Sequence, residues 1–193
     1  DLLGYGLSDK PNLTYTNYLY VQLLNDFIKK IIGRKTDIIA TGHSFPIAVM
    51  TCHNNPDVVN RLVGINPESL FNCNMIPSRY SKLLKIILDS PVIGTFIFNL
   101  LTTRNNIEID FKEKYIHNSL LIADDLIEAY LESSRLNKSS SKYAISSFLG
   151  KYTNANIIHA LKEINNSIYL ICGKEELNID PIVNNYEYYN ISI

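Results

Sequence analysis

The stretch that decides the fold of this 193-residue chain is Gly42-His43-Ser44-Phe45-Pro46. The apolar run before it, residues 37–41 (DIIAT), predicts a buried strand, covered on both faces like the strands of a parallel sheet. The run after it, residues 47–53 (IAVMTCH), predicts a helix. A strand, a tight turn with serine at its apex and a helix form the context of a nucleophile elbow. We therefore interpret Ser44 as a candidate nucleophile; the alternative is a serine in an ordinary turn.

The last residue of the turn departs from the usual G-x-S-x-G pattern, because Pro46 replaces the second glycine. Proline is tolerated in a first helical turn, where its fixed φ fits and its missing N–H would have no helical partner. The backbone N–H that follows the serine belongs to Phe45. It lies at a predicted helix start, where a developing oxyanion can be stabilised. Phe45 is therefore the predicted oxyanion donor.

The rest of the chain carries motifs that resemble one family. The opening residues 1–11 (DLLGYGLSDKP) resemble the D-x-x-G-x-G-x-S-D-x-P loop that follows the fourth strand of lid-bearing α/β-hydrolases. Helix, strand, elbow, helix and strand then follow in the family's order. Residues 160–164 (ALKEI), a strand and residues 173–176 (GKEE) resemble the family's approach to its acid residue. The resemblance spans nearly the whole chain and implies a serine nucleophile.

The order of predicted elements indicates an α/β fold. Strands at residues 37–41 and 61–66, each followed by a turn or helix, imply a parallel, doubly wound sheet with right-handed crossovers. Strand character returns at residues 167–173. The resemblance implies a sheet of the α/β-hydrolase type, truncated at both ends, in an internal piece of a longer protein.

A helical insertion is predicted between the second and third of these strands. Helical patterns dominate from about residue 71 to residue 164, and the Ser/Lys-rich residues 137–142 predict a hydrophilic loop. We expect a hydrolase core in residues 1–70 and 165–193. The insertion, residues 71–164, matches the position of the family's lid.

The resemblance also implies an acid and a base, in the chain order serine, acid, histidine. The acid position lies three residues past the glycine that ends the last predicted strand, which is Glu176. Glu175 and Asp180 remain alternatives, and Glu68, after the second strand, is a less favoured substitute.

The four histidines do not supply an obvious base: His43, His53, His117 and His159 all precede the final strand. The family places its base after that strand. One account is that the catalytic histidine lies beyond residue 193, as the family's other oxyanion loop would precede residue 1. The other account is that this protein has no base and no hydrolytic activity.

Composition excludes several function classes. The net charge is −1 without a long basic run, so we expect no nucleic-acid partner. Charged residues, Pro91 and Gly94 interrupt the apolar residues 83–101, which predict two short amphipathic helices and no integral membrane segment. No signal peptide is visible, and we expect a cytoplasmic location. The absence of a phosphate-binding turn leaves little support for a nucleotide-binding Rossmann domain.

No metal or cofactor is expected from the sequence. The three cysteines, at positions 52, 73 and 172, have no C-x-x-C spacing, which argues against a zinc site and a disulfide framework. No set of His, Cys, Asp and Glu residues has the sequence spacing of a metal site.

The leading hypothesis is a serine hydrolase that forms an acyl-enzyme with a small, largely apolar ester or related carbonyl substrate. Serine at the apex argues against dehalogenase and epoxide hydrolase chemistry, which uses aspartate in this fold. Aromatic residues of the lid, such as Phe96, Phe98 and Tyr130, are candidates to line a substrate pocket. The alternatives are an acyltransferase with the same triad and a catalytically silent ligand-binding protein on the hydrolase fold. The oligomeric state is left open.

Overall fold

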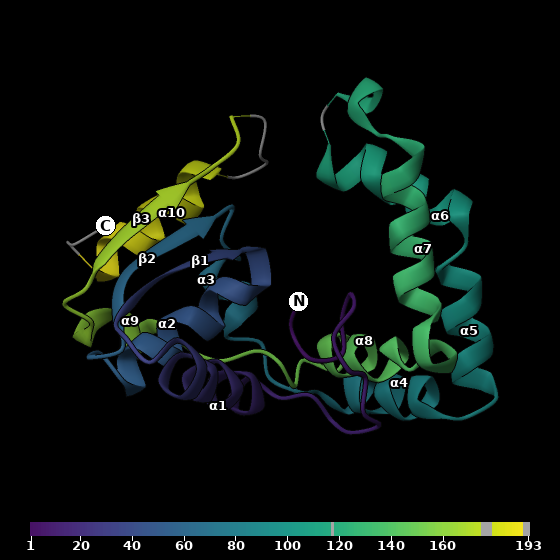
Figure 1. Cartoon of the computed structure of the whole chain (residues 1–193), viewed down its shortest axis with the longest axis horizontal. Helices are drawn as coiled ribbons and strands as arrows, with labels where there is room; N and C mark the ends of the chain where they lie inside the picture. The colour runs from purple at the N-terminus through teal and green to yellow at the C-terminus, as the bar shows by residue number, and fades with distance from the viewer. Residues whose placement is uncertain (117, 175–178, 191–193) are drawn as a thin grey trace. The chain divides into compact units, whose positions relative to one another are not determined.

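The computed structural model describes residues 1–116, 118–174 and 179–190 (Figure 1). The chain folds into two compact units. The helical unit comprises Asp1–Tyr15 and Pro77–Tyr152, and the sheet unit comprises Thr16–Ile76 and Thr153–Ile193. Compared with the expected boundaries, residues 1–15 belong with the helices, and residues 71–76 and 153–164 belong with the sheet.

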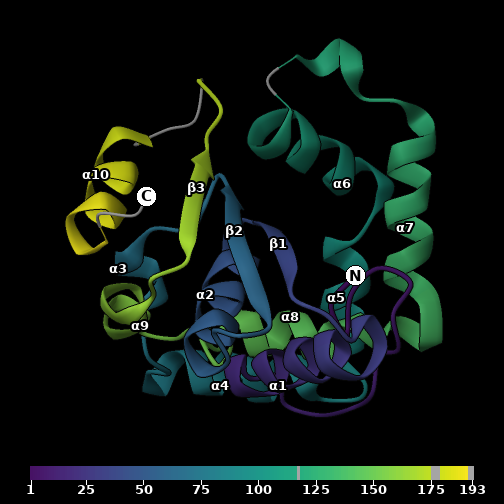
Figure 2. The same cartoon turned by 60° about the vertical axis from the view of Figure 1, so that its left-hand side comes forward.

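Three parallel strands form the sheet, in the order β1 (Thr36–Thr41), β2 (Val59–Ile65), β3 (Ser167–Ile171). Their arrows run in the same direction, so their carboxyl ends lie at one edge (Figures 1 and 2). Ala40 pairs with Gly64, and Gly64 pairs with Leu170. The predicted α/β fold with a parallel sheet is confirmed.

The helices of the sheet unit include the one predicted after Ser44. They are α1 (Asn17–Phe27), which continues as a π-helical turn (Ile28–Ile32), α2 (Phe45–Asn54), α3 (Leu70–Cys73), α9 (Ile158–Glu163) and α10 (Ile179–Tyr189). The Thr16 hydroxyl caps α1 by accepting the N–H of Leu19 at 3.2 Å. Gly33 ends the π-helical turn.

The core of the sheet unit covers one face of the sheet. Leu62 and Ile168 point into it, and Phe45 of α2 and Tyr186 of α10 pack among them. On the opposite face, Ile39 is 67% exposed and Tyr169 is 52% exposed. The expectation that both faces of β1 are covered is therefore wrong for the described residues. Among the described residues β1 alternates, with Ile38 and Ala40 buried and Ile39 exposed.

In the part that the structure describes, the helical unit is built from five main helices and short helical turns. The helices are α4 (Arg79–Asp89), α5 (Ile93–Leu101), α6 (Arg104–Asp110), α7 (Asp124–Ser139) and α8 (Ser141–Leu149). The turns are Phe111–Tyr115 and Ser119–Leu121. The break between α4 and α5 falls at residues 90–92, as predicted. Within the described residues no single helix is long and apolar enough to span a membrane. Taken together, α4 and α5 are long and apolar enough, but the chain bends by 94° between them.

The predicted hydrophilic loop at residues 137–142 is wrong. Residues up to Ser139 belong to α7 and α8 begins at Ser141. The reason is that Ser139 and Lys142 have internal partners: the Ser139 hydroxyl donates to Asn99 at 2.7 Å. The buried Lys142 ammonium donates to the Ser90 carbonyl at 2.9 Å and the Thr95 hydroxyl at 2.7 Å. Burial lowers the pKa of Lys142.

Candidate functional site

Ser44 lies where β1 turns into α2, at the carboxyl edge of the sheet. Gly42–Ser44 forms a single 3₁₀ turn that leads directly into the helix. Gly42 has a φ of 48°, in the left-handed region that favours glycine. Ser44 itself has φ −78° and ψ −19°, an ordinary right-handed conformation. The turn therefore differs from a strained elbow, because its left-handed residue is the glycine and the serine is relaxed.

The hydroxyl of Ser44 is not used to cap its own helix. Ser44 occupies the N-cap position of α2, and its side chain is partly exposed and makes no capping hydrogen bond. A capping serine has an extended backbone, which brings its oxygen to an N–H of the first turn. Because Ser44 is right-handed, its oxygen is free of that role.

The predicted oxyanion donor, the Phe45 N–H, has a partner in this conformation. It donates to the Gly42 carbonyl, which also accepts the N–H of Glu68 at 3.3 Å. A substrate oxygen can use the Phe45 N–H only after the turn releases it from Gly42.

The fully buried Phe45 ring fixes the start of α2 on the sheet. Its neighbour Pro46 is also buried, in the first turn of the helix. A Cβ atom on Gly64 would lie 2.9 Å from the Phe45 ring, so glycine on β2 makes room for it. The ring also packs against Tyr186, with centroids 5.7 Å apart.

Asn66 ties the ends of β2 and β3 together at the same edge. Its φ is 42°, which is uncommon for a residue with a side chain. Its N–H donates to the Ile171 carbonyl, and its side-chain oxygen accepts the N–H of Gly173, both at 2.8 Å. This residue was not among the predicted site residues. An Asn that directly follows a strand and precedes proline was the available signal.

Of the candidate acids, Glu68 and Asp180 lie among the described residues. Glu176 and Glu175 lie outside the described residues. β3, the strand that precedes them in the sequence, ends at the carboxyl edge. The Glu68 carboxylate accepts the Ser69 N–H at 3.2 Å and the Asn72 amide at 2.7 Å, so it supports the start of α3. Asp180 lies in the first turn of α10.

The described histidines pair with groups other than Ser44. His43 Nε2 lies 3.0 Å from the Thr153 hydroxyl. His53 and His159 both contact Glu163, at 2.8 and 3.0 Å. His117 lies outside the described residues. Among the residues with described positions, therefore, no histidine is paired with Ser44 as a base.

The contact of His53 and His159 with Glu163 was not predicted. Their spacing in the sequence indicated no metal set, yet their three potential ligand atoms lie within 4.8 Å of one another. The signal that could have indicated it is the i, i+4 spacing of His159 and Glu163, which places both on one face of α9.

The helical unit contains a cavity of about 780 Å³. Its walls include Tyr5, Ile107, Phe111, Tyr130 and Ile145, with Asp110 and Glu132 among the polar lining groups. Phe111 and Tyr130 meet edge to face at 4.8 Å. The volume is within the range of small-molecule pockets. Of the predicted aromatic candidates Tyr130 lines this cavity, whereas Phe98 is buried in packing and Phe96 is 69% exposed.

Comparison with solved structures identifies the fold. No protein-family model matches the chain, and no curated protein matches it. A carboxylesterase from Nitrososphaera gargenis is 14% identical, with a TM-score of 0.63 over 100% of this chain and 66% of its own. A serine hydrolase involved in carbazole degradation is 15% identical, with a TM-score of 0.68 over 100% of this chain and 65% of its own.

A third similar structure belongs to an enzyme with a different activity. It is a haloalkane dehalogenase from Agrobacterium tumefaciens, 16% identical, with a TM-score of 0.62 over 97% of this chain and 67% of its own. All three are α/β-hydrolase enzymes, and the chain has the α/β-hydrolase fold. It spans about two thirds of the length of these structures.

Proposed function

We propose that this chain supplies the nucleophile of a serine hydrolase. The observation that carries the proposal is the position of Ser44: it follows the first strand at the carboxyl edge, and its partly exposed hydroxyl makes no capping bond. Ligands bind at this edge in open α/β sheets. The fold of the similar carboxylesterase and serine hydrolase supports hydrolysis in general, and serine at this position supports ester chemistry.

The reaction we propose is acyl transfer to Ser44. Its Oγ attacks the carbonyl carbon while a histidine takes the hydroxyl proton, which gives a tetrahedral oxyanion. The Phe45 N–H, released from Gly42, stabilises that oxygen. The oxyanion collapses, the alcohol leaves with the proton from the histidine, and water then releases the acid from the acyl-enzyme by the same steps.

The other members of the triad belong to the proposal as well. We propose that Glu176 orients the histidine, because its place in the sequence resembles the family's acid position. The base is proposed to follow the last strand of the complete protein, because His43, His53 and His159 have other partners. The substrate is proposed to be a small, largely apolar ester or related carbonyl compound.

A second function, a catalytically silent ligand-binding protein, is favoured by two observations at the turn. The Phe45 N–H is already satisfied by Gly42, and Ser44 is relaxed. A turn that never opens would bind no oxyanion. An acyltransferase would use the same proposed steps, with an alcohol or thiol in place of water.

The proposal is tested by ester turnover in the protein translated from the complete reading frame. We expect hydrolysis of p-nitrophenyl acetate and butyrate, and a loss of about 10⁴-fold or more in kcat for Ser44→Ala. Ser167→Ala is the matched control, since Ser167 is an exposed serine at the amino end of β3, and it should keep full activity. Equal activity in Ser44→Ala would contradict the proposal. Absence of turnover with binding of the same esters would favour the silent protein.

A further inference from the structure

Two helices of the sheet unit bring together three side chains that bind metals in other proteins. His53 lies near the end of α2, and His159 and Glu163 lie one turn apart on α9, which packs against α2. Each carboxylate oxygen of Glu163 faces one imidazole: Oε2 lies 2.8 Å from His53 Nε2, and Oε1 lies 3.0 Å from His159 Nε2. The two rings meet edge to face, with centroids 5.5 Å apart.

From this arrangement we propose that His53, His159 and Glu163 form a binding site for a divalent transition metal, with zinc as the best fit. Two imidazoles and one carboxylate are a zinc ligand set, and three protein ligands leave a coordination position for water. The ligand atoms lie within 4.8 Å of one another, and bonds of about 2.0–2.1 Å to one ion need small rotations of these side chains. The side chains of His159 and Glu163 are 74% and 54% exposed, so they have room to rotate inward.

The surroundings of His53 and Glu163 favour a cation between them. His53 Nδ1 lies 3.4 Å from the Asn54 side-chain oxygen, which can accept its N–H and leave the Nε2 lone pair facing Glu163. A neutral imidazole in that tautomer would set its lone pair against a carboxylate oxygen, and a metal ion between them removes the repulsion.

Buried thiols are poor competitors for the same ion. Burial raises the pKa of Cys52 to about 11 and of Cys73 to about 12, which keeps both protonated at neutral pH. A metal at the proposed site would join α2, which carries Ser44 at its start, to α9, which precedes β3. Because an ion that binds the folded state alone stabilises it, zinc is expected to raise the melting temperature.

The test is a zinc titration of the 193-residue chain against a chromophoric chelator, with cobalt absorption to report the ligand geometry. We expect one zinc ion per chain, and at least about tenfold weaker binding for each of His53→Gln, His159→Gln and Glu163→Gln. Two controls should bind zinc as the unmodified chain does. Asp26→Asn removes an exposed helical carboxylate paired with Lys30, and His43→Gln removes a histidine outside the cluster.

The melting temperature gives a second readout on the same variants. Zinc should raise it in the unmodified chain and in both controls, and leave it unchanged in Glu163→Gln. No zinc uptake by the folded chain would overturn the proposal. Uptake of equal affinity in all three ligand variants would also overturn it, since the ion would then bind elsewhere.

Discussion

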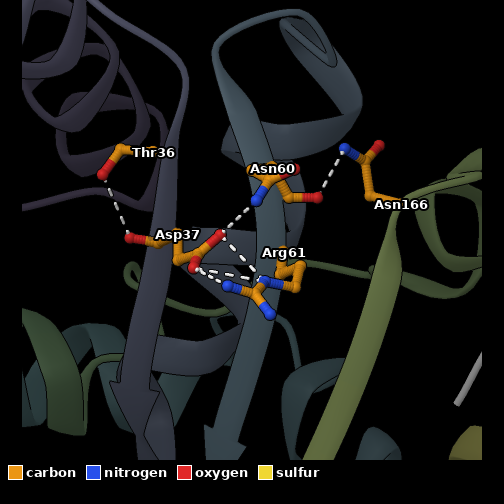
Figure 3. A network of polar contacts seen from close by, with 5 residues as sticks. All are labelled: Thr36, Asp37, Asn60, Arg61 and Asn166. Atoms are coloured by element: carbon orange, nitrogen blue, oxygen red, sulfur yellow. Dashed lines mark hydrogen bonds and ion pairs between the residues drawn. The ribbon is translucent and has the colours of Figure 1, made fainter.

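The two edges of the three-stranded sheet use polar residues in opposite ways. At the amino edge the polar groups satisfy one another: Figure 3 shows the Asp37 carboxylate between Arg61 and Asn60 of the neighbouring strand. Asp37 accepts from Arg61 Nη2 at 2.6 Å and from the Asn60 amide at 2.7 Å. Asn166 donates to the Val59 carbonyl at 2.7 Å. This edge is a closed network that fixes strand register.

At the carboxyl edge the Ser44 hydroxyl differs from its polar neighbours. Asn66 and Glu68 are engaged in fixing loops and a short helix, but the Ser44 hydroxyl makes no capping bond at a position where serine normally caps. The contrast separates polar side chains that hold strands together, at the amino edge, from a serine that makes no capping bond, at the carboxyl edge. Three substitutions test this contrast, and their expected effects decrease in the order Phe45, Asn66, Asp37.

Phe45→Ala should give the largest loss of stability. Its ring is fully buried against Gly64 and Tyr186, so truncation leaves a cavity under the turn that holds Ser44. We expect the free energy of unfolding to fall by about 3–5 kcal/mol, measured by urea denaturation. Phe71→Ala is the control, since Phe71 is 74% exposed in the same unit, and it should change stability by about 0.5 kcal/mol or less. Equal effects of the two would mean that the Phe45 ring does not anchor α2.

Asn66→Ala should cost less, about 2 kcal/mol by the same measurement. The change removes the hydrogen bond to Gly173 and forces alanine into a left-handed backbone. Asn66→Gly separates the two causes, because glycine keeps the backbone conformation and loses the side-chain interactions; we expect about half the loss. Stability as high as that of the unmodified chain in Asn66→Ala would show that the tie between β2 and β3 is not needed.

Asp37→Asn should have the smallest effect, and one that depends on pH. The hydrogen bond from Arg61 holds the pKa of Asp37 below its usual 3.8. The ionised carboxylate therefore stabilises the fold above pH 3.8, and this contribution is lost as the pH falls below that value. The unmodified chain should melt at most a few degrees above Asp37→Asn at pH 6, with the difference shrinking toward pH 3.

Melting curves at several pH values measure this difference. Arg61→Gln should lower the melting temperature at pH 6 in the same way, because this substitution removes the donor to Asp37. A difference that grows as the pH falls would have the wrong sign for a carboxylate with a lowered pKa.

The parts of the fold that were predicted depend on local patterns. The strands around residues 37–41, 61–66 and 167–171, and the break after Asp89, follow from apolar runs, capping residues and proline. The loop prediction failed at Lys142, which is buried. The sequence does not indicate that its partners, Ser90 and Thr95, lie inside the same unit.

The candidate site was predicted only in outline. The position of Ser44 at the carboxyl edge followed from the strand and helix around it. The turn itself is closed by the Gly42 carbonyl, which accepts the N–H of Phe45 and that of Glu68, a residue that follows β2. His53 contacts Glu163, 110 positions away in the sequence, because α2 packs on α9. Such contacts come from tertiary structure and leave no spacing in the sequence.

The most direct test of the central claim is covalent labelling with a fluorophosphonate probe, followed by mass spectrometry of the labelled peptide. In the protein translated from the complete reading frame, the account predicts one phosphonyl adduct on Ser44, absent in Ser44→Ala and retained in Ser167→Ala. An adduct that persists in Ser44→Ala, or a folded protein that takes up no probe, would contradict the claim that Ser44 is an activated nucleophile.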